Sequence, residues 1–314
     1  MGKPLAYNAT VVGRTDLTDT LSTFLIQPDT PPRTRPWFTA GQYCVLGLNN
    51  SERPSLGSVR RAMSIASAPE ADLPLEFYIR YVARPTSQNP LTHLLWKLGT
   101  GARIHLRSVA AGVFTIKDTV GIDDARIRVM VAAGTGAAPF ITMIRSEVRR
   151  NPTADFSKWV LLHGASYARE LGYRQELLEL TKTNQLKYWG TVSRQSESGN
   201  WSGDVGRVES FFEPDRVPNL ERRLGLAAGS LMPDRAVIFV CGLTGTIGRA
   251  LALLLDRGFV PRAQAIRDAL GVPPDVSDSM FYELYDSTPV IDIDDPAVIE
   301  PLRARMQTAL ARNL

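Results

Sequence analysis

The sequence has few of the residues that mark disulfide-rich or metal-binding proteins. Only two of its 314 residues are cysteines, Cys44 and Cys241, and they lie far apart. Two cysteines cannot supply a four-cysteine iron–sulfur cluster or zinc ribbon, and so low a count fits a reducing compartment better than a disulfide scaffold. The three histidines, His93, His105 and His163, lack metal-ligand spacing, so we interpret them as structural and expect no metal site.

Long apolar runs and a strong excess of one charge are also missing. No apolar stretch approaches the roughly 18 residues that span a bilayer, and no apolar core follows the N-terminal Met1-Gly2-Lys3-Pro4, so we expect neither a membrane segment nor a secretory signal. Lys and Arg outnumber Asp and Glu by 36 to 32, an excess that favours an acidic partner but is too small to indicate nucleic acid. We therefore expect a protein that binds neither nucleic acid nor membrane. We also predict that it is cytoplasmic and a monomer.

The N-terminal part of the chain is rich in short β-type segments. Apolar residues make up 44% of the sequence, enough to fill the cores of about two domains. β-Branched and aromatic residues predict strands at 9–12, 22–26, 43–46, 62–66, 75–82 and 103–106. Short strands separated by turn signals indicate a barrel. One helix is predicted at 91–98, with Thr92 as its candidate cap. We place the end of this domain at residue 122.

After Asp123 the pattern changes to alternating strands and helices. We predict strands at 127–132, 159–163 and 236–240, and helices at 139–150, 171–181 and 246–257. This alternation indicates a parallel sheet covered on both faces. We place the second domain at 123–285 and a helical C-terminal extension at 286–314.

Two motifs indicate ligand binding. Gly134-Thr135-Gly136-Ala137-Ala138-Pro139 follows a predicted strand and opens a helix, where backbone N–H groups and the helix dipole favour an anion such as a pyrophosphate. Arg61-Ala62-Met63-Ser64 puts a guanidinium and a hydroxyl on one strand, suited to a phosphate and a ring nitrogen of one extended ligand. Each motif alone has a plain alternative: a tight turn without ligand for the first, and a solvated arginine and serine for the second.

The order of the motifs is more specific than any one of them. The Arg-x-x-Ser strand and the Gly-Thr-Gly-x-Ala-Pro loop stand in one series with three further segments: Pro90-Leu91-Thr92, Val192-Ser193-Arg194 and Cys241-Gly242. This series resembles the ferredoxin–NADP reductase family over nearly all of residues 5–285. The bacterial ferredoxin/flavodoxin reductase branch is most similar, through three more segments: Leu75-Glu76-Phe77-Tyr78, Ala110-Ala111-Gly112-Val113-Phe114 and Gly206-Arg207-Val208.

The resemblance implies a two-domain fold with two cofactors. An N-terminal antiparallel β-barrel would bind FAD, a C-terminal doubly wound α/β domain would bind NADP(H), and the flavin would lie between them. Arg61 would bind the FAD pyrophosphate, and Ser64 would act as a catalytic residue near flavin N5, the atom that exchanges hydride. The other implied FAD contacts are Ala62, Met63, Tyr78, Pro90, Leu91, Thr92, Ala111, Gly112, Phe114 and Thr115.

The resemblance also assigns residues to NADP(H). Gly134, Thr135, Gly136 and Pro139 would hold its pyrophosphate. Cys241, as the second catalytic residue, and Gly242 would lie beside the nicotinamide. Ser193, Arg194 and Arg207 would surround the 2′-phosphate, since a hydroxyl and guanidinium groups suit a doubly charged anion. The alternative for these last three is a solvated loop.

Departures from the family pattern affect both cofactors. Met63 stands where the family has a tyrosine stacked on the flavin. Ser166 stands where the branch often has an arginine, and Arg169 is the candidate replacement. Residues 281–285 occupy the place of the usual terminal aromatic; Tyr282 is the first candidate to cover the flavin, and the alternative is that these aromatics pack in a core.

We therefore predict a ferredoxin (flavodoxin)–NADP⁺ reductase that exchanges hydride with NADPH and single electrons with ferredoxin or flavodoxin. One alternative is the NADH-dependent reductase component of an oxygenase system. Another is a flavin- or nucleotide-binding module without turnover, which Met63 and the extended tail keep open.

Overall fold

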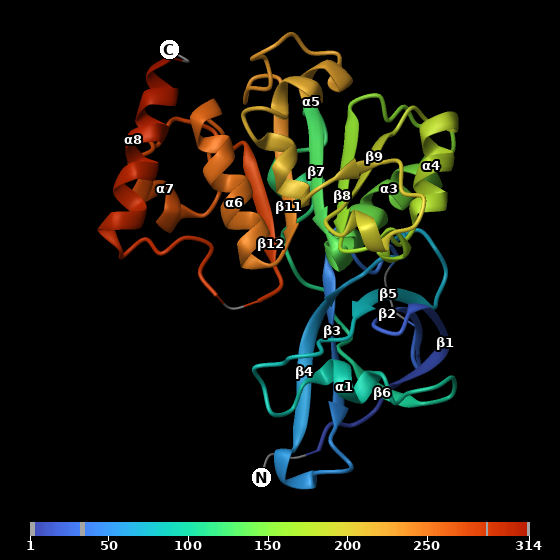
Figure 1. The fold of residues 1–314 in the computed structure, drawn as a ribbon. Coiled ribbons are helices and arrows are strands. Elements are labelled where there is room, and N and C mark those ends of the chain that lie inside the picture. The colour runs from blue at the N-terminus through green and yellow to red at the C-terminus, as the bar shows by residue number, and fades with distance from the viewer. Residues whose placement is uncertain (1–3, 32–34, 287, 313–314) are drawn as a thin grey trace. The chain divides into compact units, whose positions relative to one another are not determined.

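The computed structural model describes residues 4–31, 35–286 and 288–312, and its chain forms two compact units (Figure 1). The first unit comprises residues 1–119 and 138–154, and the second comprises 120–137 and 155–314. The segment 138–154, which includes helix α3 (Ala138–Arg150), therefore groups with the first unit, although the predicted limits assign it to the second domain. The limits 1–122, 123–285 and 286–314 stay a prediction.

The first unit is a six-stranded antiparallel barrel. Its strands pair in the order β4-β3-β6-β1-β2-β5. They are β1 (Ala9–Thr18), β2 (Leu21–Pro28), β3 (Tyr43–Asn49), β4 (Ser58–Ser64), β5 (Leu75–Arg80) and β6 (Arg103–Leu106). A bridge between Ile65 and Phe77, with a 2.8 Å hydrogen bond from Ala66 N–H to the Glu76 carbonyl, joins the end of β4 to β5. The sheet thus closes on itself around an apolar core that includes Phe24, Leu46 and Phe77.

Short helices complete the first unit: η1 (Pro54–Leu56), α1 (Leu91–Leu95) and α2 (Ile116–Thr119). Helix α1 is shorter than predicted. Thr92 is not its cap, which corrects the sequence analysis: Pro90 holds the N-cap position, and Thr92 Oγ1 accepts a 3.3 Å hydrogen bond from Val82 N–H. Proline fits there because a residue just before the first turn needs no N–H donor of its own.

Polar contacts attach α3 to the barrel. Thr142 Oγ1 donates to the Ser67 carbonyl at 2.7 Å, and Ser146 Oγ donates to Glu70 at 2.8 Å. Arg145 forms a 3.1 Å ion pair with Glu76 on β5. These contacts explain why α3 belongs to the first unit.

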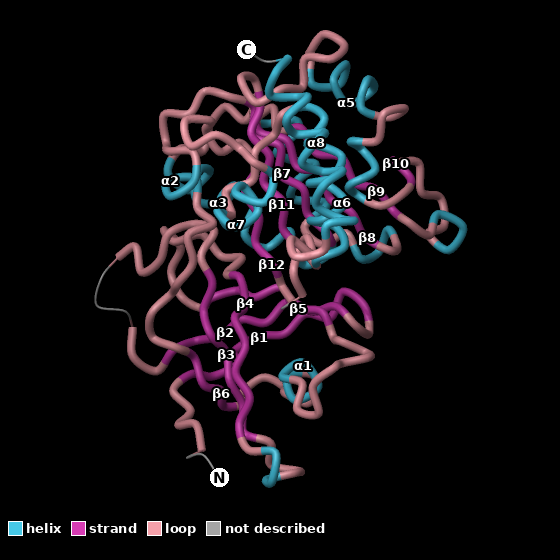
Figure 2. Tube along the Cα trace, turned by 90° about the vertical axis from the view of Figure 1, so that its left-hand side faces the viewer, coloured by secondary structure: helices cyan, strands magenta, loops and turns pink. Residues whose placement is uncertain are grey.

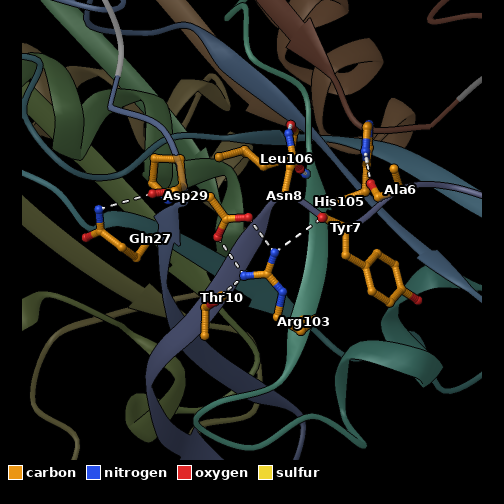
Figure 3. Close-up of polar contacts among 10 residues, drawn as sticks. Ala6, Tyr7, Asn8, Thr10, Gln27, Asp29, Arg103, His105 and Leu106 are labelled. Atoms are coloured by element: carbon orange, nitrogen blue, oxygen red, sulfur yellow. Dashed lines mark hydrogen bonds and ion pairs between the residues drawn. The ribbon is translucent and has the colours of Figure 1, made fainter.

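Arg103 ties several segments of the barrel together (Figure 3). Its guanidinium forms an ion pair with Asp29 and donates to Thr10 Oγ1 at 2.6 Å and to the Tyr7 carbonyl at 3.2 Å. Nearby, the Asn8 side chain exchanges two hydrogen bonds with the backbone of Leu106, at 2.9 and 2.8 Å. The Arg103 hydrogen bond lowers the pKa of Asp29, so the carboxylate stays charged at neutral pH.

The second unit contains a six-stranded parallel sheet of the doubly wound type, as predicted. Its strands are β7 (Ile127–Ala133), β8 (Trp159–Ala165), β9 (Lys187–Val192), β10 (Asp204–Val205), β11 (Ala236–Gly242) and β12 (Met280–Leu284). Their order is β10-β9-β8-β7-β11-β12, so the chain proceeds away from β7 in both directions. Ligands of such sheets bind beyond the carboxyl ends of the strands where this order reverses.

Helices flank the parallel sheet (Figure 2). They are α4 (Arg174–Thr183), α5 (Val217–Leu224), α6 (Thr244–Leu254), α7 (Gln264–Leu270) and α8 (Pro296–Arg312). Turns of 3₁₀ type join them: η2 (Gly134–Ala137), η3 (Ala168–Glu170), η4 (Gln195–Glu197), η5 (Val208–Phe212) and η6 (Leu255–Arg257). Helix α8 buries Ile299, Met306 and Ala309, and the first two of these lie in the same core cluster as residues of β7 and β11. The C-terminal helix is therefore part of the packing of this unit.

Candidate functional site

One part of the site lies where β7 and β11 end, and we call it the buried turn (Gly134–Ala137 with Cys241 and Gly242). Cys241 is in register with Ala132 of β7. A Cβ on Gly136 would lie 2.1 Å from the Cys241 carbonyl oxygen, so only glycine allows this close packing. The structure thus brings two predicted NADP(H) motifs together at the point where the strand order reverses.

A buried histidine supports the buried turn. His163 Nε2 lies 3.3 Å from the Gly134 carbonyl oxygen, and the Tyr188 hydroxyl lies 3.5 Å from His163 Nδ1. Burial lowers the pKa of His163 to about 4, so its ring is neutral at neutral pH. A neutral ring protonated on Nε2 donates to Gly134 and accepts from Tyr188. His163 therefore fixes the direction of the Gly134 carbonyl.

Cys241 is fully buried at the end of β11. Burial raises the pKa of its thiol well above the usual value, Glu283 raises it further, and a hydrogen bond with Tyr285 opposes both effects. The group is therefore a neutral thiol at neutral pH.

Tyr285, which follows β12, contacts both halves of the buried turn. Its N–H donates to the Gly242 carbonyl at 3.0 Å, and its hydroxyl donates to the Thr135 carbonyl at 3.4 Å. Tyr282 lies within β12, in register with Val240, and packs against the core of the unit. This is the core packing that the sequence analysis left as an alternative; a contact between Tyr282 and a flavin stays a prediction.

The other part of the site lies where β8 and β9 end, and we call it the cationic edge (Tyr167, Arg169 and Arg194). Arg194 donates a hydrogen bond to the Tyr167 hydroxyl, and its Cζ lies 5.3 Å from the centre of that ring. Arg169 Cζ lies 4.3 Å from the same ring centre. In the described part of the chain, neither guanidinium forms an ion pair. Two cations on one ring, at the exposed end of a sheet, suit an anionic ligand.

The other predicted 2′-phosphate residues lie near the cationic edge along the backbone. Ser193 N–H donates to the Ala165 carbonyl at 3.1 Å, and Arg194 N–H donates to the Ser166 carbonyl at 3.0 Å. Gly206 N–H donates to the Val192 carbonyl at 2.9 Å, so the exposed Arg207 begins its turn beside the end of β9. The sequence analysis missed Tyr167, because no charge or spacing marks it.

The predicted FAD-binding residues of the first unit lie on β4, on β5, at the start of α1 and in the loop after β6. Tyr43 connects β4 with the loop after β6: it pairs with Ser64 across β3 and β4, and it exchanges two 2.9 Å backbone hydrogen bonds with Ala111. Gln42 Nε2 donates to the Gly112 carbonyl at 3.0 Å. Gln42 and Tyr43, which the sequence analysis missed, therefore hold Ser64 close to Ala111.

The predicted FAD contacts differ in exposure. Arg61 and Ala62 are exposed, Met63, Pro90, Ala111 and Gly112 are half-buried, and Ser64, Tyr78, Leu91, Thr92, Phe114 and Thr115 are buried. The Phe114 ring lies 5.7 Å from Phe140 of α3, and Thr115 Oγ1 donates to Asp118 at 2.7 Å and accepts from its N–H at 3.0 Å. Phe114 and Thr115 thus have packing and helix-capping roles of their own. Their contacts with FAD stay predictions.

The donor chemistry of each unit fits the predicted cofactor. The exposed Arg61 guanidinium on β4 suits the phosphates of FAD. The buried turn and the cationic edge suit a dinucleotide with an additional phosphate. Across residues 4–31, 35–286 and 288–312, no group of three or more His, Cys, Asp or Glu side chains could hold a metal ion, and no helix is long and apolar enough to cross a membrane.

Comparison with known proteins agrees with this arrangement. The sequence profile of the family described as oxidoreductase NAD-binding domain matches residues 130–249. Over 227 residues the chain is 33% identical to ferredoxin–NADP reductase B of Sorangium cellulosum, covering 72% of this chain and 82% of that protein. Over 244 residues it is 30% identical to ferredoxin–NADP reductase of Azotobacter vinelandii, covering 72% and 88%.

Solved structures share the fold. A ferredoxin–NADP⁺ reductase of Neisseria gonorrhoeae with bound FAD and NADP matches with a TM-score of 0.67 and 22% identity, covering 89% of this chain and 98% of that one. A cytochrome P450 reductase of Amycolatopsis matches with a TM-score of 0.62 and 20% identity, covering 90% and 70%. On the sequence identity and coverage above, the chain belongs to the ferredoxin–NADP reductase family, whose members are FAD- and NAD(P)-binding oxidoreductases.

Proposed function

We propose that this protein is a FAD-containing reductase that exchanges hydride with NADPH and single electrons with ferredoxin or flavodoxin. The cationic edge carries the proposal, because its guanidinium groups, which form no ion pair with the residues that the structure describes, suit the 2′-phosphate that distinguishes NADPH from NADH. The named relatives, which are ferredoxin–NADP reductases, support the same reaction. A bound flavin would supply the redox chemistry, namely hydride acceptance and the release of single electrons.

The second unit provides the residues for NADP(H). Backbone N–H groups of Gly134, Thr135 and Gly136 would hold the pyrophosphate, and His163 keeps the Gly134 carbonyl turned toward the interior. Pro139, the other predicted contact, follows in α3, which groups with the first unit. The neutral thiol of Cys241 and the Gly242 backbone would orient the nicotinamide. Ser193, Arg194 and Arg207 would contact the 2′-phosphate.

The first unit provides the residues for FAD. Arg61 would bind the pyrophosphate together with Pro90, Leu91 and Thr92, and Ser64 would hydrogen-bond near N5. Replacing Arg61 by alanine removes a charge-assisted contact of roughly 1.5–3 kcal/mol, so FAD should dissociate about ten to a hundred times more readily. Arg60→Ala is the matched control, because Arg60 is also exposed but points to the other face of β4. Flavin retained after dialysis measures the effect; equal retention in both variants contradicts the assignment.

The proposed reaction is tested with the purified protein. We expect a flavin absorbance spectrum that NADPH bleaches rapidly, followed by reoxidation when ferredoxin or flavodoxin is added. A bound flavin that neither NADPH nor NADH reduces would instead identify a binding module without turnover. Reduction by NADPH without transfer to ferredoxin or flavodoxin would contradict the proposed acceptors.

Two observations favour a second candidate, the NADH-dependent reductase component of an oxygenase system. Ser166 stands at the end of β8, where an arginine would strengthen binding of the 2′-phosphate. The chain is also 36% identical over 124 residues to methane monooxygenase component C of Methylosinus trichosporium, which covers 33% of that protein. The ratio of kcat/KM for NADPH and NADH decides between the two candidates: a ratio above one supports the reductase of ferredoxin or flavodoxin.

A further inference from the structure

The cationic edge is arranged around one aromatic ring. Tyr167 is half-buried and has extended backbone angles, φ −129° and ψ 152°, immediately before η3. The Glu170 N–H donates to the Tyr167 carbonyl at 3.0 Å, which closes the turn. This turn brings the Arg169 guanidinium back over the ring of Tyr167, while Arg194 reaches the same ring from the end of β9.

Two guanidinium groups beside the same ring repel each other, so their arrangement needs a stabilising partner. The electron-rich face of an aromatic ring attracts cations within about 6 Å of its centre, and both arginines satisfy this distance. The Tyr167 hydroxyl adds a hydrogen bond that it accepts from Arg194. Arginine side chains have many rotamers, so a fixed ring lowers the entropy lost when a phosphate binds.

A second link holds the two loops in place. Ser198 Oγ donates to the Arg194 carbonyl at 2.8 Å and accepts from the Ala168 N–H at 3.3 Å. The loop after β8 and the loop after β9 are therefore connected through backbone groups as well as through Tyr167. The carboxylates of Glu170 and Glu197 lie near enough to Arg194 to raise its pKa, although Tyr167 contributes more.

We propose that Tyr167 is a positioning residue for NADPH recognition, which holds Arg194 and Arg169 on one ring as a paired site for the 2′-phosphate. Arg169 thereby replaces the arginine that the chain lacks at position 166. This inference rests on the proposed role of Arg194 in binding NADPH.

The test uses two nucleotides that differ by one phosphate, 2′,5′-ADP and 5′-AMP, with titration calorimetry on the flavin-loaded protein. Tyr167→Leu removes the ring, and we expect affinity for 2′,5′-ADP to fall about tenfold while affinity for 5′-AMP stays the same. Tyr167→Phe keeps the ring and loses only the hydroxyl, so a smaller loss of about threefold is expected. Arg169→Ala should lower affinity for 2′,5′-ADP about five- to tenfold.

Arg174→Ala is the matched control. Arg174 is an exposed arginine whose Cζ lies 5.4 Å from the centre of the Trp201 ring, and it has no place in the proposed site. We expect this variant to bind both nucleotides like the wild type. If Arg174→Ala lowers the affinity for 2′,5′-ADP as much as Arg169→Ala does, the paired site is contradicted, because the general positive charge of the surface then explains the effect.

A double-mutant cycle separates positioning from overall structure. With Arg194 already replaced by alanine, Tyr167→Leu should cost clearly less affinity for 2′,5′-ADP than it does in the wild type. Equal costs in both backgrounds would overturn the positioning role, and so would unchanged affinity in Tyr167→Leu and Arg169→Ala. Should Tyr167→Leu fail to fold, Tyr167→Phe and Arg169→Ala still decide.

The same data distinguish failure of this inference from failure of the proposed function. If the wild type binds 2′,5′-ADP and 5′-AMP equally and Arg194→Ala changes neither, the preference for NADPH itself is wrong. If Arg194→Ala lowers the affinity for 2′,5′-ADP but not for 5′-AMP, while the Tyr167 and Arg169 variants leave both affinities unchanged, only the positioning role is wrong.

Discussion

The buried turn and the cationic edge border the same end of one parallel sheet, yet they differ in burial and charge. The buried turn depends on a glycine, a neutral histidine and a protonated thiol, all enclosed by the protein. The cationic edge consists of exposed guanidinium groups on a half-buried ring. Under the proposed function, the first region meets the parts that NADH and NADPH share, and the second meets the one phosphate that differs.

This difference has consequences for how each region responds to change. Backbone N–H groups in a tight turn act on any dinucleotide, so a distortion there affects both coenzymes. Exposed charges act through water and salt, so their effects are smaller and depend on conditions. A change in the buried turn should therefore be large and unselective, whereas a change in the cationic edge should be selective.

The largest expected effect comes from Gly136→Ala in the buried turn. The new Cβ would lie 2.1 Å from the Cys241 carbonyl oxygen, so the backbone must move. A shift of about 1 Å in a binding group costs on the order of a hundredfold, and we expect kcat/KM to fall by that factor with NADPH and NADH alike. Steady-state kinetics with both coenzymes measure it.

Gly245→Ala is the control for this change. Gly245 lies in α6, and a Cβ there meets nothing within 4 Å. Alanine in a helix is favoured over glycine by up to about 1 kcal/mol, so this variant should keep full activity and gain slight stability. A Gly136→Ala variant as active as Gly245→Ala would show that the turn accommodates a Cβ at Gly136 without a harmful backbone shift.

The next effect concerns pH and His163. Its pKa is about 4 when buried and near 6.5 when unfolded, so below pH 6.5 the unfolded chain binds more protons and stability falls. The loss grows by about 1.4 kcal/mol per pH unit, reaching about 2 kcal/mol at pH 5. His163→Gln should show a shallower decline between pH 6.5 and 5 in urea unfolding. Equal slopes in wild type and variant would contradict a lowered pKa of His163 in the folded protein.

The smallest effect is the response of the cationic edge to salt. Charges are screened beyond about 10 Å at 0.1 M salt and about 3 Å at 1 M. Between these concentrations kcat/KM for NADPH should fall a few-fold, whereas that for NADH should change less than about twofold. A parallel decline for both coenzymes would remove the contrast between the two regions.

The sequence predicts regular elements well where local pattern and tertiary packing agree. The run of apolar residues before Gly134 predicts strand β7, and the alternation of apolar and polar residues around Phe24 predicts strand β2. The sequence pattern does not predict strand β12, because Glu283 interrupts its apolar residues. This segment forms a strand because it pairs with β11. Thr92 looks like a cap by residue type, but its hydroxyl bonds to a distant N–H that the sequence cannot reveal.

The site divides in the same way. Arg194 and Cys241 stand in motifs whose order along the chain points to a dinucleotide. Tyr167 could not be predicted, because its importance depends on η3 bringing Arg169 back over the ring. From the sequence, Gly136 is expected to let a phosphate approach the backbone. The structure shows that the absence of a side chain there also makes room for the Cys241 carbonyl.

The most direct test of the account is the effect of Arg194→Ala on kcat/KM with NADPH and with NADH, measured on the flavin-loaded enzyme. Loss of the guanidinium removes a contact of roughly 1.5–3 kcal/mol with the 2′-phosphate, so we expect a ten- to hundredfold loss with NADPH. NADH lacks that phosphate, and its kcat/KM should stay within about twofold of the wild type. Equal losses with the two coenzymes would contradict the division of the site into a shared and a discriminating region.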